Sequence, residues 1–134
     1  MKLVRVFLCA AACALAIGAF GQTSAGDLVV DVPFAFSANG KKLPAGHYIV
    51  TQKIDMIRIF NHDSVGLFVP TMLAFRTRVD GSKLEFHRYG DEYFLAAVWI
   101  TGSKSGKELF PSSAEREAKA KHAEMEMAVV RPAQ

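Results

Sequence analysis

The stretch KLEFHRYGDEYFLAAVWI, residues 83–100, contains the clearest structural signal in this chain. Extended runs lie on either side of Gly90-Asp91, and Gly before Asp suits a two-residue type II′ hairpin, because Gly takes φ > 0 at the first central position. In that register Tyr89 faces Glu92. The next pairs are Arg88 with Tyr93, Phe86 with Leu95 and Leu84 with Ala97 on one face, and His87 with Phe94, Glu85 with Ala96 and Lys83 with Val98 on the other.

One face of this hairpin is expected to line the core, and its members are Leu84, Phe86, Tyr93, Leu95, Ala97 and Trp99. The run Phe94–Ile100 is apolar on both faces, which is typical of a strand that is covered on both sides. We therefore expect the C-terminal part of the chain to cover the second face, over Phe94, Ala96 and Val98.

Strand-like alternation recurs before the hairpin. The predicted strands are Asp27–Phe36, His47–Lys53, Met56–Phe60, Val65–Val69 and Thr71–Val79. Pro33 lacks an N–H and places the first strand at an edge or a bulge, while Pro70 is expected to end the fourth. With short turns between the runs, the pattern predicts an all-β fold, an antiparallel sandwich or small barrel of about 6–7 strands.

After the hairpin, residues 101–107 are predicted to form a polar loop, and one C-terminal α-helix is expected over residues 111–128. Ser112 and Glu115 match a capping box at its start, and good helix formers follow. Its apolar residues are mostly alanine, so its hydrophobic stripe is weak. Residues 129–134 are predicted to be a flexible tail, which leaves residues 26–110 as the antiparallel β domain.

The N-terminus is typical of a secretory signal peptide over residues 1–25. Lys2 and Arg5 precede an apolar run, and Thr23-Ser24-Ala25 resembles a cleavage signal, with Gly21 as a second candidate site. The run is shorter than the ~20 residues of a spanning helix, so no transmembrane span is expected after cleavage. The protein is therefore predicted to be exported, to the periplasm or out of the cell.

Removal of that segment changes the composition of the mature chain. Both cysteines are lost with it, so the mature domain has neither a disulfide nor a thiol nucleophile. The formal charge falls from +3 to about +1, because Lys2 and Arg5 leave and no acidic residue does. The remaining basic residues are scattered, whereas nucleic-acid binding needs a concentrated basic footprint. Nucleic acid is therefore not an expected partner.

Residue patterns that carry catalysis or bind metals are missing. The histidines His47, His62, His87 and His122 lack the close spacing that lets neighbouring residues share a metal ion. The sequence contains no G-x-S-x-G nucleophile elbow, and its serines cluster in predicted turns or at the helix start. We predict no catalytic residues, no metal site and no cofactor, and we expect the protein not to be an enzyme.

Arg88 is the residue with the strongest candidate role. It can end the core by stacking on Tyr93 or by pairing with Glu115 or Glu117 of the helix. Alternatively, it can bind an anion at the mouth of a barrel lined by Tyr93 and Trp99. The candidate ligand-binding residues are therefore Arg88, Tyr93 and Trp99.

Three blocks carry a resemblance to known sequences: VPFAFSANGKKLPAGHYIV (residues 32–50), FHRYGDEYFLAAVW (86–99) and GKELFPSSAERE (106–117). In this order they resemble an uncharacterised family of small exported proteins of soil bacteria. The resemblance implies an exported domain and supplies no catalytic or ligand residues. The LPAGHY piece alone also resembles turn-strand segments of carboxypeptidase-regulatory-like sandwiches. That match is short, and the preferences of turn-forming residues explain it.

These observations lead to three functional hypotheses. The first is a structural or interaction module of the cell envelope, with an envelope protein as its partner and an exposed sheet edge along Val29–Ala35 as one possible contact. The second is a barrel that carries a small apolar ligand or a lipid. The third is an enzyme of unknown class.

Overall fold

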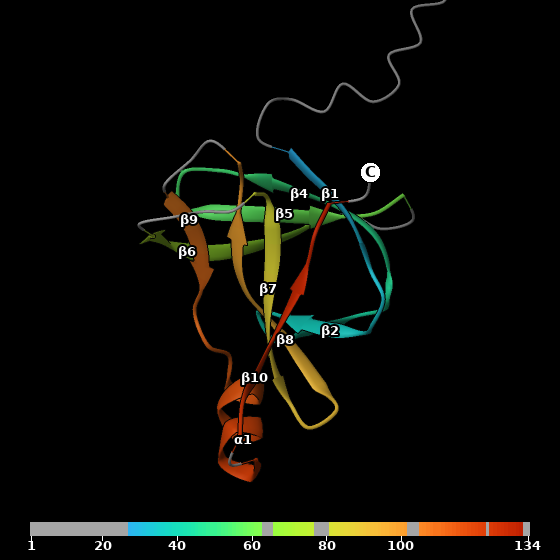
Figure 1. Cartoon of the computed structure of the whole chain (residues 1–134), viewed down its shortest axis with the longest axis vertical. Coiled ribbons are helices and arrows are strands. Elements are labelled where there is room, and N and C mark those ends of the chain that lie inside the picture. The colour runs from blue at the N-terminus through green and yellow to red at the C-terminus, as the bar shows by residue number, and fades with distance from the viewer. Residues whose placement is uncertain (1–26, 63–65, 77–80, 102–104, 123, 133–134) are drawn as a thin grey trace, which may run out of the picture.

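The structure is a computed structural model that describes residues 27–62, 66–76, 81–101, 105–122 and 124–132. Those residues form ten strands and one helix (Figure 1). The expected signal peptide lies outside the described residues. The strands are β1 (Asp27–Val32), β2 (Phe36–Ala38), β3 (Lys41–Leu43), β4 (Gly46–Gln52), β5 (Met56–Phe60), β6 (Leu67–Phe75), β7 (Lys83–Tyr89), β8 (Glu92–Trp99), β9 (Ser105–Leu109) and β10 (Glu126–Val130), with α1 (Ser113–Lys121) between β9 and β10.

The strands join into one mixed sheet. Its order is β1-β4-β5-β6-β9-β8-β2-β3, and β7 pairs with both β8 and β10. The pair formed by β2 and β8 is parallel, and the other pairs are antiparallel. Strands β4, β5 and β6 cross the direction of β7, β8 and β10 (Figure 1). The sheet curls, so that Val30 of β1 forms a bridge with Pro132, just after β10.

The all-β prediction is confirmed. The expected antiparallel sandwich or small barrel is wrong, because the strands form one open mixed sheet with a parallel pair, and the expected count of about 6–7 strands is too low. Strands β3, β9 and β10 lie where the sequence predicted a turn, a polar loop and the end of a helix. Strand β3 has only three residues, β9 has few apolar residues, and β10 directly follows a run of good helix formers, so none of them shows a clear alternation of its own. They form because other strands offer backbone partners: β9 pairs with β6 and β8, and β10 pairs with β7.

Pro70 does not end a strand as expected. Strand β6 runs through it, pairing with β5 over Leu67–Pro70 and with β9 over Thr71–Phe75. The missing N–H of Pro70 therefore falls where the strand changes its hydrogen-bonded partner. By contrast, Pro33 does end β1 and separates it from β2.

The central hairpin confirms the predicted turn and half of the predicted register. Gly90 has φ 62°, and the pairs from Tyr89–Glu92 to Phe86–Leu95 are as expected. Between Glu85 and Phe86 the register then shifts by one, which pairs Glu85 with Ala97 and Lys83 with Trp99. This β-bulge turns the end of β8 over, because a shift of one residue exchanges the two faces of a strand.

The bulge divides the apolar residues of the hairpin between separate clusters. Leu84, Phe86, Leu95 and Val98 join the main core, while Ala97 and Trp99 pack on the other face with Ala74. The expectation that Ala97 and Trp99 share the core face of Phe86 is therefore wrong. A β-bulge leaves one residue of the ladder unpaired, and the remaining pairs of the two strands still form. No local sequence pattern predicts where such a bulge occurs.

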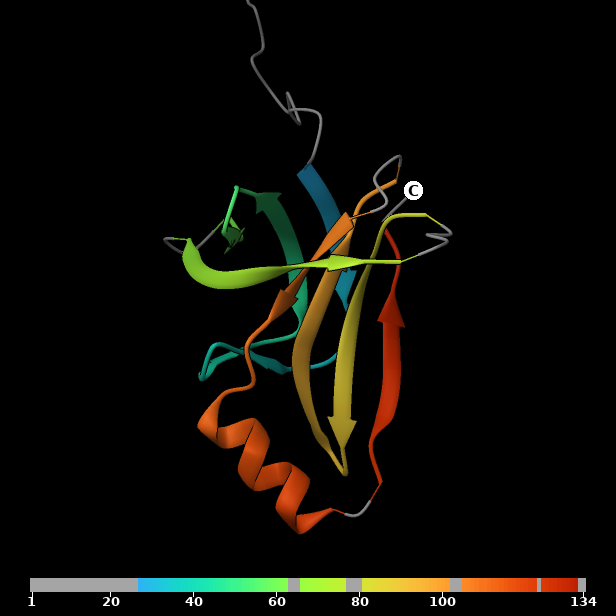
Figure 2. The same cartoon turned by 90° about the vertical axis from the view of Figure 1, so that its left-hand side faces the viewer.

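Helix α1 begins as predicted, with the backbone N–H of Glu115 donating to the Ser112 Oγ at 3.2 Å. It ends earlier, at Lys121, and it is not C-terminal because β10 follows it. Ala118 packs against Tyr89 and Phe94, so α1 covers part of the second face of the hairpin, as expected (Figure 2). The predicted tail is wrong at Val129 and Val130, which lie in β10 and pair with Glu85 and Leu84.

Candidate functional site

Arg88 and Tyr93 lie together, and Trp99 lies elsewhere. The Arg88 guanidinium is 5.4 Å from the centre of the Tyr93 ring, which confirms the predicted stacking, and its Nε donates to the Gly90 carbonyl at 2.8 Å. The ion-pair partner of Arg88 is Glu126 at 3.5 Å, not Glu115 or Glu117. Trp99 is fully buried in the separate cluster beyond the bulge. Only two of the three candidate ligand-binding residues therefore share a site.

The interior of the curled sheet is filled with aromatic side chains. The Phe36 ring packs edge-on against Tyr48 and Phe86, with ring centres 5.3 Å apart in each case. Phe34 stacks on Tyr93 at 3.8 Å, and it contacts Phe86 edge-on. These rings occupy the space in which a barrel-type carrier would hold its ligand.

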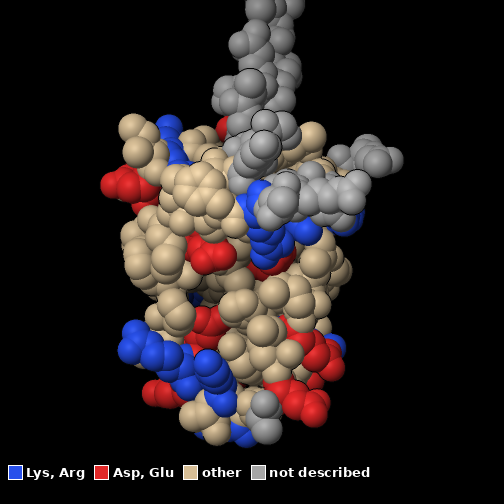
Figure 3. Space-filling model, turned by 60° about the vertical axis from the view of Figure 1, so that its left-hand side comes forward, with Lys and Arg blue, Asp and Glu red and all other residues tan. Residues whose placement is uncertain are grey.

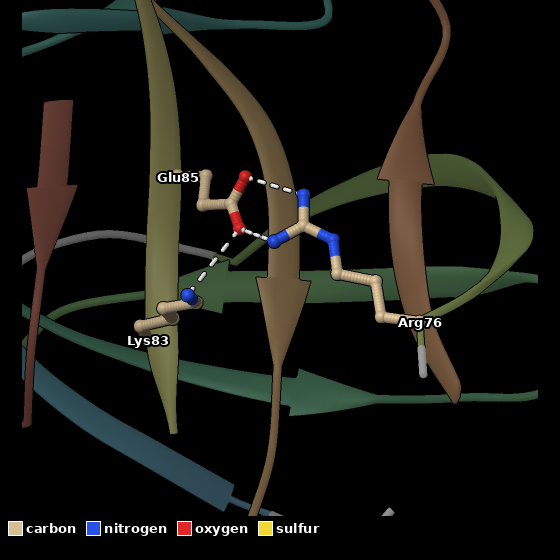
Figure 4. Close-up of polar contacts among 3 residues, drawn as sticks. All are labelled: Arg76, Lys83 and Glu85. Carbon is tan, nitrogen blue, oxygen red and sulfur yellow. Dashed lines mark hydrogen bonds and ion pairs between the residues drawn. The ribbon is translucent and has the colours of Figure 1, made fainter. Parts of the chain in front are cut away.

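A charge cluster around the buried Glu85 lies on the opposite face of the sheet. The Glu85 carboxylate is only 3% exposed and accepts two hydrogen bonds from the Arg76 guanidinium, with Lys83 Nζ 3.7 Å away (Figure 4). The same guanidinium lies 4.3 Å from the centre of the Trp99 ring. The cluster joins the end of β6 to β7, and its charges satisfy one another. We therefore assign it a structural role.

A recess between β7 and α1 combines an apolar wall with ionisable groups. It has a volume of about 350 Å³ and is lined by His87, Tyr89, Phe110, Pro111, Glu115, Arg116 and Lys119. The His87 Nδ1 lies 2.9 Å from the Glu115 Oε1, and the Glu115 residue is 8% exposed. Burial, and secondarily the negative charge of Glu115, raise the pKa of the Tyr89 hydroxyl above its usual 10.0.

The sequence did not predict this pairing of a histidine with a carboxylate. Glu115 was one of two helix residues expected as a possible ion-pair partner of Arg88, but it pairs with the neighbouring residue, His87. Adjacent residues of a strand point to opposite faces, and α1 covers the face of β7 that carries His87. The helix capping pattern located Glu115 along the chain, but only the packing of α1 selected its partner.

Two further recesses lie near the hairpin turn. The wider, with a volume of about 500 Å³, is lined by Arg88, Gly90, Lys121, His122, Glu124 and Glu126. The smaller, of about 160 Å³, lies beside β2 and β8 and includes Tyr93 and Phe94. The wide recess is lined by charged side chains of both signs and, among the described residues, by no aromatic residue other than His122, whereas the recess beside α1 is also lined by Tyr89 and Phe110.

The described residues contain no group of three or more His, Cys, Asp or Glu side chains that could hold a metal ion. His47 pairs with Asp31 at 2.7 Å, and its ring stacks on that of His62 with centres 6.5 Å apart. Within the same described ranges, no helix is long and apolar enough to cross a membrane.

Strand β6 carries four large exposed apolar side chains, which we call the β6 strip. Its members are Phe68, Met72, Leu73 and Phe75, exposed by 55%, 38%, 54% and 72%.

Basic and acidic side chains are interspersed on the face of the molecule shown in Figure 3. That face therefore lacks the single-sign charge expected of a nucleic-acid surface.

Comparison with known proteins gives no significant match. No family model matches the chain, and neither a curated protein nor a solved structure is significantly similar to it.

Proposed function

We propose that this chain is an exported, non-enzymatic interaction module of the cell envelope, and that it binds a partner protein through the β6 strip. The observation that carries the proposal is the exposure of four large apolar side chains on one nine-residue strand. Leu73 and Phe75 are two residues apart, so they share one face of the strand and form an exposed apolar pair. Exposed apolar patches typically mark interaction sites.

The backbone of β6 supports the same proposal. Strand β5 pairs with β6 only as far as Pro70, and β9 occupies the other edge from Thr71 onward. Among the described residues, no strand pairs with the remaining edge of Met72–Phe75. An open edge beside exposed Leu73 and Phe75 suits the addition of an extended segment, in which backbone hydrogen bonds add to side-chain contacts.

A photo-crosslinking experiment tests the partner proposal. The full chain is expressed in a bacterium with p-benzoylphenylalanine in place of Phe75, and a second version carries the same group at Lys41, an exposed residue of β3. We expect one discrete cross-linked protein at position 75 that is absent at position 41. The variant L73K should abolish that product, since a charge on the strip opposes burial of its apolar surface.

The control variant is V129K, which places the same charge on an exposed apolar residue of β10, outside the strip. It should leave the cross-linked product unchanged. Equal products at positions 75 and 41, or equal losses in L73K and V129K, would contradict docking on the β6 strip.

Export is tested separately by the mass of the protein recovered from the periplasm and from the medium. Cleavage after Ala25 predicts a mature chain that begins at Gly26. Recovery of the uncleaved chain in the cytoplasm would contradict the proposed localisation without bearing on the β6 strip.

A further inference from the structure

The recess between β7 and α1 has the properties of a small-molecule site. We propose that it binds a small aromatic carboxylate, with the ring against Phe110 and Tyr89 and the anion beside His87, Arg116 and Lys119. This site lies apart from the β6 strip, so the inference does not depend on the proposed partner protein.

The size and walls of the recess favour a ligand with a ring system. Its volume of about 350 Å³ lies at the lower end of the range of ligand pockets, which holds one or two fused rings. Phe110 is 53% exposed in a position that lines the recess, while Tyr89 is buried beneath it. A ligand ring would cover the apolar surface that Phe110 leaves in contact with water.

The charges around the recess favour an anion. Glu115 is the one acidic residue lining it, and its carboxylate is engaged by His87. Arg116 and Lys119 lie one and four residues further along α1, and both are exposed. Arg116 makes a long hydrogen bond of 3.3 Å to the Pro111 carbonyl, and Lys119 has no ion pair among the described residues. Two cations against one paired carboxylate leave a positive rim.

His87 offers a directional hydrogen bond to a ligand at the base of the recess. Its Nδ1 faces the Glu115 carboxylate and therefore carries a proton that it donates. The Nε2 has no hydrogen-bond partner among the described residues, and the ring lines the recess. Both nitrogens of an imidazolium ring are donors, so Nδ1–H can donate to Glu115 while Nε2–H donates to a ligand carboxylate. Such orientation of a histidine by a buried carboxylate fixes which nitrogen meets the ligand.

The test compares two probes of the same shape by NMR titration of the ¹⁵N-labelled mature domain, residues 26–134. The probes are 2-naphthoate, which is anionic, and 2-naphthamide, which is its neutral isostere. We expect saturable shift changes for 2-naphthoate at His87, Tyr89 and residues 110–119. Binding of the amide should be weaker by about fivefold or more, as expected for the loss of partly exposed charge contacts.

Rim variants distinguish a built site from general attraction to a basic surface. R116Q combined with K119Q should reduce the affinity for 2-naphthoate to that for the amide, whereas K121Q should not change it, because Lys121 lines a different recess. These side chains are exposed, so the variants should fold normally. The inference is overturned if 2-naphthoate produces no saturable changes at the recess, if the amide binds equally well, or if K121Q has the same effect.

Discussion

At the scale of single residues, Gly106 lies directly against the indole of Trp99. A Cβ atom at position 106 would approach the Trp99 Cε3 to 2.5 Å, which is far inside normal contact distance. We expect G106A to lower the free energy of unfolding by about 1–3 kcal/mol, because the indole is buried and cannot move away freely.

Urea denaturation measures that effect, with G46A as the matched control. A Cβ at Gly46 would lie 3.9 Å from its nearest neighbour, the Tyr48 Cε2, which is ordinary contact. A loss of stability in G46A as large as that in G106A would assign the effect to the backbone and not to the indole.

Ionisation of Tyr89 makes the free energy of unfolding depend on pH in the alkaline range. Its folded-state pKa is raised above 10.0, chiefly by burial and also by the charge of Glu115. The folded state therefore holds the phenol proton more tightly than the unfolded chain does. The resulting stabilisation is present below about pH 10 and is lost as pH rises through the folded-state pKa.

The variant Y89F cannot ionise at this position and lacks that loss. We expect the unfolding free energy of the wild type to fall more steeply than that of Y89F between about pH 9 and pH 11. Chemical denaturation at several pH values measures the difference between the two proteins. Parallel pH profiles would show that Tyr89 ionises equally in the folded and unfolded states.

At the scale of elements, the pair of Arg76 and Glu85 holds the end of β6 against β7. R76M leaves the Glu85 carboxylate buried without its bidentate partner, and Lys83, at 3.7 Å, is too distant to replace it fully. We expect R76M to destabilise the fold by about 2–4 kcal/mol. The double variant R76M/E85M should recover most of this loss in thermal denaturation, because it removes both charges. Additive losses would show that the charges stabilise the fold independently.

Strand β10 is the element for which the sequence and the structure differ most. Ala128 pairs with Phe86 in the middle of β10, and A128P fixes φ and removes the N–H at this position of the strand. We expect a loss of about 2 kcal/mol or more in the unfolding free energy, since the substitution also costs the packing of Val130 against the core. A128S, which retains the N–H, serves as the control. Equal stability of A128P and the wild type would contradict a structured β10.

At the scale of the whole molecule, one continuous sheet joins the clusters on its two faces. Trp99, the one tryptophan of the chain, reports on the smaller cluster, while far-ultraviolet circular dichroism reports on the sheet. We expect the two signals to change at the same denaturant concentration, because β8 contributes residues to both clusters. Separate midpoints would show that the Trp99 side of the sheet unfolds independently.

The sequence predicted features that depend on neighbouring residues. The Gly90 turn, the adjoining pairs of the hairpin, the all-β class and the Ser112 cap all follow from local backbone preferences and side-chain alternation, and all are present. The stacking of Arg88 on Tyr93 also follows, because a hairpin register places these two residues opposite each other.

Only the tertiary structure decided the features that depend on which segments meet. The bulge at Glu85 moved Trp99 away from Tyr93, the free edge of β7 ordered Glu126–Val130 as a strand, and the packing of α1 brought Glu115 to His87. Each outcome is set by the free energy of burial and of backbone pairing between segments distant along the chain. A local residue pattern cannot predict that free energy, because it does not specify which segments meet.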